Sequence, residues 1–210
     1  YGPGESVYVD EAGRLHLAVN KKEGVWHSAE VSSYSMALNG RYLFRVTLPN
    51  TPPVDPKVAI AMFLYSDDEH EYDIEISQFL SRFDCSLIDC KSCVNQCNDC
   101  QIQFVRQPFC ESGSWQRYAW PRPLHESIHE IILNRGEIVE LSSSDRKLFP
   151  RHTISHQFPE NTGTNIEYHL HLSIWLKDEG GAENPNTPSK PLRQEVIFEA
   201  LEIPVDMYDG

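Results

Sequence analysis

Residues 58–76 read VAIAMFLYSDDEHEYDIEI, and this stretch decides how the chain folds. Its first part, from Val58 to Tyr65, is a continuous apolar run bounded by prolines and acidic residues, which is typical of a fully buried strand. From Glu71 to Ile76 polar and apolar residues alternate strictly. Such alternation predicts a strand with one face in the core and the other turned outward. We therefore expect two consecutive strands, the first of them in the middle of the core.

Short alternating runs separated by turn signals continue this pattern along the chain. Helical periodicity is not convincing over any stretch of 12 residues, and turn signals such as Asn39-Gly40 and the Gly-, Asn- and Pro-rich residues 180–191 punctuate the runs. The pattern predicts an all-β fold, a two-sheet antiparallel β-sandwich or jelly roll. The other expected strands include residues 7–9, 15–19, 42–46, 131–133, 138–141, 168–176 and 195–203.

Length and charge exclude several classes of protein. The chain has 210 residues, 40% of them hydrophobic, which is ample for one core and thin for two, so we expect one domain over residues 1–210. Its 31 acidic and 18 basic side chains give a formal net charge of −13, which repels nucleic acids and anionic membranes. No apolar run approaches the roughly 20 residues that span a bilayer. We expect neither a nucleic-acid partner nor membrane insertion.

Three carboxylates share the outward face of the alternating strand: Glu71, Asp73 and Glu75. At about 3.3 Å per residue the two Glu Cα atoms lie roughly 13 Å apart, and side chains that lean inward leave about 5 to 6 Å between their carboxyls. A retaining glycosidase uses this separation, with one carboxylate as nucleophile and a second of raised pKa as general acid/base. Asp73 would raise the pKa values of its neighbours and orient the nucleophile. A solvated strand face and a calcium site are the alternatives.

All six cysteines lie between Cys85 and Cys110, in a segment that we expect to be a loop insertion, residues 85–110. An even number of cysteines in a short polar loop favours disulfides and an oxidising compartment. Two Cys-x2-Cys pairs also allow a structural zinc, although their three-residue spacer is shorter than in zinc knuckles. Unpaired thiols are the third interpretation. The candidate zinc ligands are Cys90, Cys93, Cys97 and Cys100.

On these residues the sequence resembles glycoside hydrolase family 16, the concanavalin A-like jelly-roll enzymes that cleave β-glucans and related polysaccharides. The Glu-x-Asp-x-Glu hallmark of the family stands at residues 71–75. The resemblance implies that Glu71 is the nucleophile, Asp73 its assisting residue and Glu75 the general acid/base, in a cleft on a concave sheet. It also implies a retaining mechanism that requires no cofactor. Further similar segments lie at residues 26–33, 40–49, 103–108 and 172–176.

Candidate substrate-binding residues are aromatic or polar. Sugar rings present an apolar face, so glycan sites carry exposed aromatic platforms with polar groups between them. Trp26 and Trp115 are candidate platforms, and Trp115 has the more polar surroundings. Gln107 resembles the polar residue that the family places beside the cleaved bond. His169 and His171 share a strand face, but ordinary strand histidines are commoner than metal ligands, so we expect no metal there.

These observations predict a retaining glycoside hydrolase that acts on a β-linked polysaccharide or oligosaccharide, with a β-1,3- or mixed-linkage glucan as the first choice. The alternatives are a transglycosylase of cell-wall glycans and a non-catalytic carbohydrate-binding protein on the same fold. We expect a monomer that is secreted or held at the cell surface, with any export signal outside the given sequence.

Overall fold

The structure is a computed structural model of the chain. It describes residues 6–23, 25–49, 54–55, 57–77, 100–107, 114–119, 125–134, 137–145, 153–159, 166–176 and 193–204. All the regular secondary structure in these ranges is β-strand. The described residues contain no helix that is long and apolar enough to cross a membrane. The strands are β1 (Val7–Val9), β2 (Leu15–Lys22), β3 (Val25–His27), β4 (Ala29–Met36), β5 (Gly40–Thr47), β6 (Val58–Asp67), β7 (His70–Ser77), β8 (Cys100–Arg106), β9 (Trp115–Ala119), β10 (Glu126–Asn134), β11 (Ile138–Asp145), β12 (Thr153–Pro159), β13 (His169–Leu176) and β14 (Gln194–Glu202).

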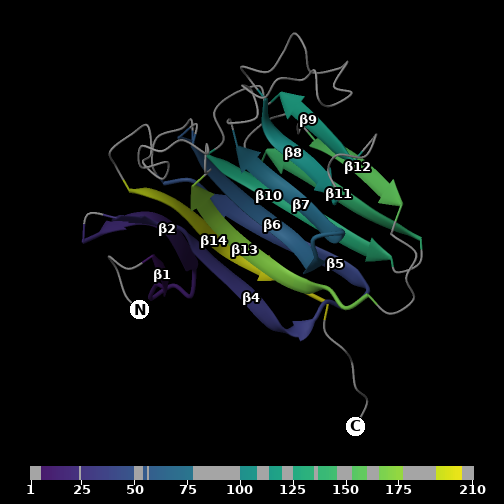
Figure 1. Ribbon diagram of the computed structural model, residues 1–210, viewed down its shortest axis with the longest axis horizontal. Coiled ribbons are helices and arrows are strands. Elements are labelled where there is room, and N and C mark those ends of the chain that lie inside the picture. The colour runs from purple at the N-terminus through teal and green to yellow at the C-terminus, as the bar shows by residue number, and fades with distance from the viewer. Residues whose placement is uncertain are drawn as a thin grey trace.

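The strands form two antiparallel sheets packed face to face. The first has eight strands in the order β1-β2-β14-β5-β10-β11-β12, with β3 paired to β2. The second has six in the order β4-β13-β6-β7-β8-β9. Figure 1 shows the blue strands β6 and β7 in the middle of the second sheet, between green β13 and teal β8. The predicted two-sheet β-sandwich is thereby confirmed.

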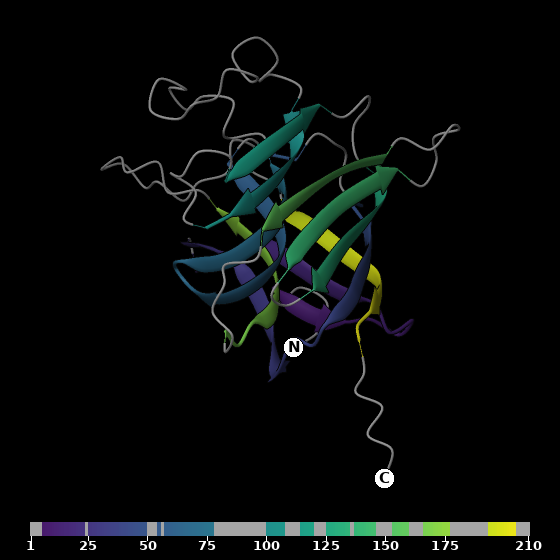
Figure 2. The same cartoon turned by 90° about the vertical axis from the view of Figure 1, so that its right-hand side faces the viewer.

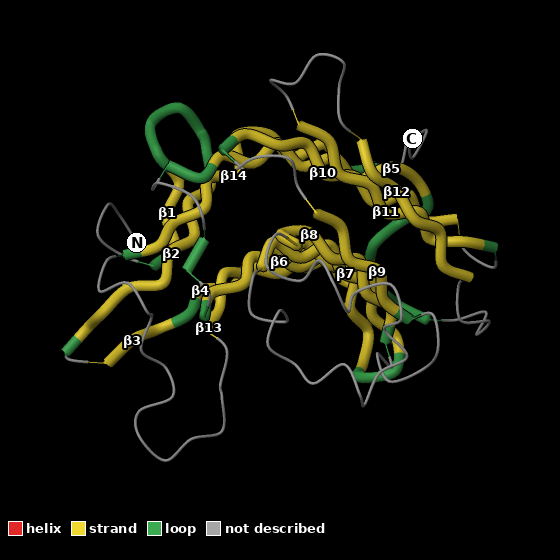
Figure 3. The backbone as a smooth tube through the Cα atoms, turned by 90° about the horizontal axis from the view of Figure 1, so that it is seen from above, coloured by secondary structure: helices red, strands yellow, loops and turns green. Residues whose placement is uncertain are grey.

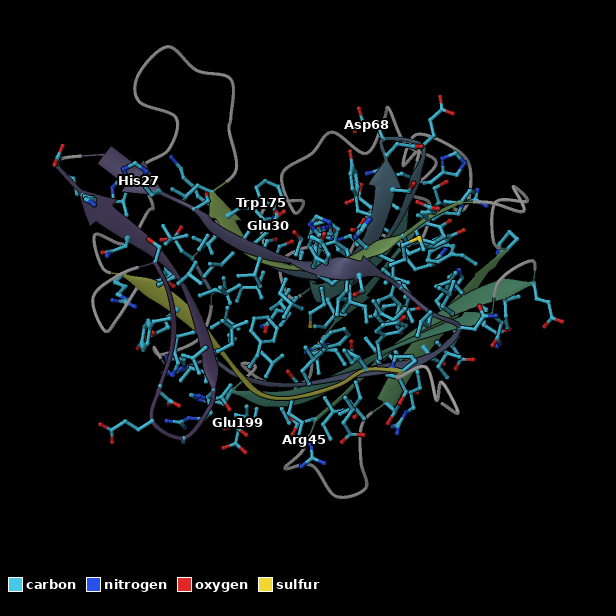
Figure 4. All side chains as sticks on the ribbon, turned by 90° about the horizontal axis from the view of Figure 1, so that it is seen from below. His27, Glu30, Arg45, Asp68, Trp175 and Glu199 are labelled. Carbon is cyan, nitrogen blue, oxygen red and sulfur yellow. The ribbon has the colours of Figure 1, made fainter. Side chains whose placement is uncertain are left out.

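The six-stranded sheet is curved. Seen from above, it bows toward the eight-stranded sheet, so its outer face is the concave one (Figure 3). Figure 2 shows the two layers from the side, with the green strands β11 and β12 of the eight-stranded sheet toward the viewer. Figure 4 places Glu30 and Trp175 on the outer side of the six-stranded sheet, and Arg45 and Glu199 on the opposite side of the molecule.

The core between the sheets explains why β6 and β7 are central. Residues 58–64 of β6 are all buried, as expected for a strand covered on both faces. In β7, Tyr72 and Ile74 are fully buried and Ile76 is 1% exposed, and all three belong to the main apolar cluster. The turn between the two strands is held by Asp67, whose Oδ1 accepts hydrogen bonds from the Glu69 backbone N–H at 2.9 Å and from His70 Nδ1 at 2.7 Å. Alternation in the sequence thus fixes which face of β7 is inside.

Four strands were not expected from the sequence: β3, β4, β9 and β12. Each of them pairs with only one neighbour. Strand β4 is largely exposed, and β12 alternates between exposed and partly buried positions until Phe158. An edge strand that buries few side chains has little apolar periodicity to mark it.

Candidate active site

Glu71, Asp73 and Glu75 stand on the outer, concave face of the six-stranded sheet. The alternate positions 72, 74 and 76 of β7 lie in the core, so the carboxylates point away from the other sheet. Register places Tyr65 of β6 opposite Glu71, and Gln103 of β8 opposite Glu75. The pairing brings side chains from both neighbouring strands beside the three acids.

Asp73 is the most deeply buried of the three acids, at 4% exposure. Burial, the charges of Glu71 and Glu75, and a side-chain hydrogen bond with Glu71 raise the pKa of Asp73 well above its usual range. The same hydrogen bond acts in the opposite direction on Glu71, whose pKa it lowers. It therefore favours the proton on Asp73 and the negative charge on Glu71.

Opposing influences act on the pKa of Glu71. Burial raises its pKa, and the negative charges of Asp68 and Glu30 act in the same direction. The hydrogen bond with Asp73 and the charge of His171 lower its pKa. Hydrogen-bond donors and cations favour the ionised form of a carboxyl. These two influences offset part of the rise, and the net effect leaves the pKa of Glu71 above its usual value.

Glu75 has the environment of a proton donor. Burial, followed by the negative charge of Glu71, raises the pKa of Glu75 to about 7, and the charge of Arg117 opposes this rise. Nε2 of Gln103 donates a hydrogen bond to Oε2 of Glu75, which fixes the carboxyl group. A carboxyl with a pKa near 7 can give up its proton as a general acid and take one back as a general base.

The neighbouring strands contribute side chains that the sequence does not assign to this site. On β6 these are Phe63 and Tyr65, opposite Asp73 and Glu71. His171 of β13 stacks on Phe63 with ring centroids 4.8 Å apart. Gln103 and Arg117 are paired residues of β8 and β9. Two kinds of information locate these side chains: the alternation within each strand and the register between strands. The sequence shows the alternation, but the register requires the structure.

The predicted substrate-binding residues fall in different places. The Gln107 backbone N–H donates to the Glu71 carbonyl at 3.0 Å, so Gln107 lies beside the proposed nucleophile. Trp26 is on β3, which belongs with the other sheet; its ring packs partly against the core and under Lys21 Nζ, 5.9 Å from the ring centroid. The backbone of Trp115 lies in β9, two strands from β7, and its side chain is outside the described part of the structure.

Five of the six cysteines lie outside the described residues. These are residues 85, 90, 93, 97 and 110, and of Cys100 only the backbone, at the start of β8, is described. Within the described ranges there is no group of three or more His, Cys, Asp or Glu side chains that could hold a metal ion.

By sequence, no family model and no curated protein matches the chain. By structure, it resembles glycosyl hydrolase family 16 proteins and β-glucanases. The chain has the fold of this family.

Three of these structures illustrate the resemblance. The β-glucanase of Bacillus licheniformis is 13% identical with a TM-score of 0.59, over 93% of this chain and 80% of its own. A Crh5 transglycosylase in complex with NAG is 14% identical with a TM-score of 0.55, over 96% and 76%. Rv0315, a pseudo β-1,3-glucanase of Mycobacterium tuberculosis, is 10% identical with a TM-score of 0.58, over 92% and 75%. The fold thus occurs in hydrolases, in transglycosylases and in a protein described as a pseudo-enzyme.

Proposed function

We propose that the protein is a retaining glycoside hydrolase that cleaves a β-linked polysaccharide, with a β-1,3- or mixed-linkage glucan as its substrate. The observation that carries the proposal is the division of roles on β7. Asp73 supports the charge of Glu71 by a hydrogen bond, while Glu75 keeps a pKa of about 7. The shared fold with β-glucanases supports the same assignment.

The reaction proceeds in two displacements. In the first, the carboxylate of Glu71 attacks the anomeric carbon, and the carboxyl of Glu75 gives its proton to the departing glycosidic oxygen. The product of this step is a covalent glycosyl ester on Glu71 and an ionised Glu75. In the second, Glu75 removes a proton from water, whose oxygen attacks the anomeric carbon and releases Glu71. The anomeric configuration is inverted twice and therefore retained.

Two other activities fit the same fold. In a transglycosylase a sugar hydroxyl replaces water in the second displacement, and one structural neighbour carries that description. A binding protein would need no acid at position 75, so the raised pKa of Glu75 favours turnover. We further propose that the protein works outside the cell, because the clustered cysteines suit an oxidising compartment. A monomer is the second part of this proposal.

The test is hydrolysis of a glucan panel by the wild type and by E71Q and E75Q, with E140Q as a matched control on the other sheet. We expect reducing-sugar release from at least one glucan, a loss of at least about 1000-fold in the two site variants, and no change in E140Q. A 2-deoxy-2-fluoro glycoside of the cleaved sugar should label Glu71, as peptide mass spectrometry would show. Binding to glucan without turnover in the wild type would replace the hydrolase by the binding protein.

A further inference from the structure

His171 is held in a fixed position by Glu30 from the neighbouring strand. Its Nδ1 lies 2.8 Å from Oε1 of Glu30, and the two side chains are 16% and 52% exposed. Strands β13 and β4 are paired, and Glu30 is on the outer face of their sheet (Figure 4). Because the Glu30 carboxylate accepts the proton of Nδ1, the remaining ring nitrogen, Nε2, is left for other partners.

Two aromatic rings fix the plane of the imidazole. It stacks on Phe63 at 4.8 Å with an interplanar angle of 25°, and Tyr65 meets it edge-on at 5.6 Å. Phe63 and Tyr65 are the β6 partners of Asp73 and Glu71. The side chain of His171 thus packs against Phe63 and Tyr65, and Tyr65 is the residue paired with the proposed nucleophile.

The groups around His171 are mostly acidic. From β4 comes Glu30, and from β7 come Glu71 and Asp73, with Tyr65 on β6 between them. The turn after β6 adds an aspartate at position 68, whose Oδ1 accepts a hydrogen bond from the Tyr65 hydroxyl at 3.2 Å. The remaining titratable group on the same face of β13 is a second histidine at position 169, whose Nδ1 lies 3.1 Å from the carbonyl oxygen of residue 33. Arg117 acts on Glu75 at the other end of the carboxylate row.

We propose that His171, held by Glu30, is a positioning residue for Glu71 that keeps the nucleophile ionised. This inference rests on the proposed function of Glu71. A cationic imidazolium near a carboxyl favours the ionised form of that carboxyl. The lowering effect of His171 on the pKa of Glu71 has the sign that this role requires.

The experiment compares pH profiles of kcat/KM for the wild type, H171Q and H171K. Glutamine is neutral, so we expect the acid limb of H171Q to move up by about half a pH unit, a roughly threefold loss on that limb, with the alkaline limb and KM unchanged. Lysine retains a positive charge and should return the acid limb toward the wild-type position. H27Q, which alters an exposed histidine at the end of β3, should leave both limbs in place.

A second measurement separates this inference from the proposed function. Carbon-13 NMR titration of the glutamate carboxyls, with the Glu71 signal assigned through E71Q, needs no substrate. We expect the pKa of Glu71 to be higher in H171Q than in the wild type and restored in H171K. An unchanged Glu71 titration, or a raised KM with both limbs in place, would overturn the role of His171. A shifted titration in a protein that cleaves no glycan would overturn only the hydrolase.

Discussion

Nε2 of Gln103 donates a hydrogen bond to Oε2 of Glu75 across a directly paired position of β7 and β8. The donor is a neutral amide, so it orients the carboxyl without adding the full charge of a cation. Glu75 therefore keeps a pKa of about 7 although it is firmly held. The pair explains how a buried acid can be both fixed and protonated.

We expect Q103A to lower kcat about tenfold with little change in KM, because the acid loses its orientation and its substrate contacts remain. A hydrogen bond to the ionised carboxylate favours ionisation, so its loss should also move the alkaline limb of the pH profile upward. Steady-state kinetics at several pH values measure both effects. Q157A is the control, because Gln157 pairs with Glu140 on the other sheet. A Q103A profile that coincides with the wild type would contradict this role.

The wild-type pH profile of kcat/KM should be bell-shaped with its alkaline limb near pH 7. Activity requires Glu75 protonated, and its pKa of about 7 means that the proton is lost as pH rises through that value. The acid limb should follow protonation of Glu71. An aryl glycoside whose leaving group needs no protonation should retain activity above pH 7 in the first step. Persistence of the alkaline limb with that substrate under single-turnover conditions would assign it to another group.

The central part of the fold and the three acids follow from the sequence alone. Residues 58–76 combine a buried run with strict alternation, and a period of two decides which side chains share a face. The catalytic roles of Glu71 as nucleophile, Asp73 as assisting residue and Glu75 as general acid/base stay predictions.

The remainder of the site depends on strand register, which the sequence does not encode locally. The strand that carries the carboxylates contains no Lys or Arg, yet the charge of Arg117 on β9, two strands away, lowers the pKa of Glu75. His171 is more than 90 residues from Glu71 in sequence and still acts on it. Such partners become visible only when the order β13-β6-β7-β8-β9 is known.

E75Q should be more stable than the wild type at pH 8, although it is inactive. The folded-state pKa of Glu75 is raised above the usual value of 4.5 to about 7, so its contribution to stability is present at acid pH and is lost as pH rises through 7. Glutamine removes the buried charge, and we expect a gain of up to about 3 kcal/mol in the free energy of unfolding at pH 8.

Urea unfolding of E75Q and the wild type at pH 4 and pH 8 measures this gain. The two proteins should be nearly equal at pH 4, where Glu75 is protonated in both folded and unfolded chains. E140Q, on the exposed face of β11, should show no gain at either pH. Equal stabilities of E75Q and the wild type at pH 8 would mean that Glu75 is ionised at little cost.

His129 makes the core sensitive to acid. It is fully buried on β10, with Nε2 at 2.7 Å from the Ser127 hydroxyl and Nδ1 at 2.8 Å from the Ser143 hydroxyl. Burial lowers the pKa of His129 to about 3, so the unfolded chain binds a proton that the folded chain does not between pH 6.5 and 3. The stability contributed by this site is therefore complete above pH 6.5 and is lost at about 1.4 kcal/mol per pH unit below it.

Replacing His129 with glutamine tests this linkage. We expect H129Q to be less stable than the wild type at pH 7. Its amide can bond to both hydroxyls but takes up no proton in this range, so H129Q should lose less stability on acidification. The decisive quantity is the difference in unfolding free energy between the two proteins at pH 7, 6, 5 and 4, because the raised carboxyl pKa values at the site are common to both. That difference should shrink steadily below pH 6.5. A constant difference would show that His129 takes up its proton in the folded chain as readily as in the unfolded one.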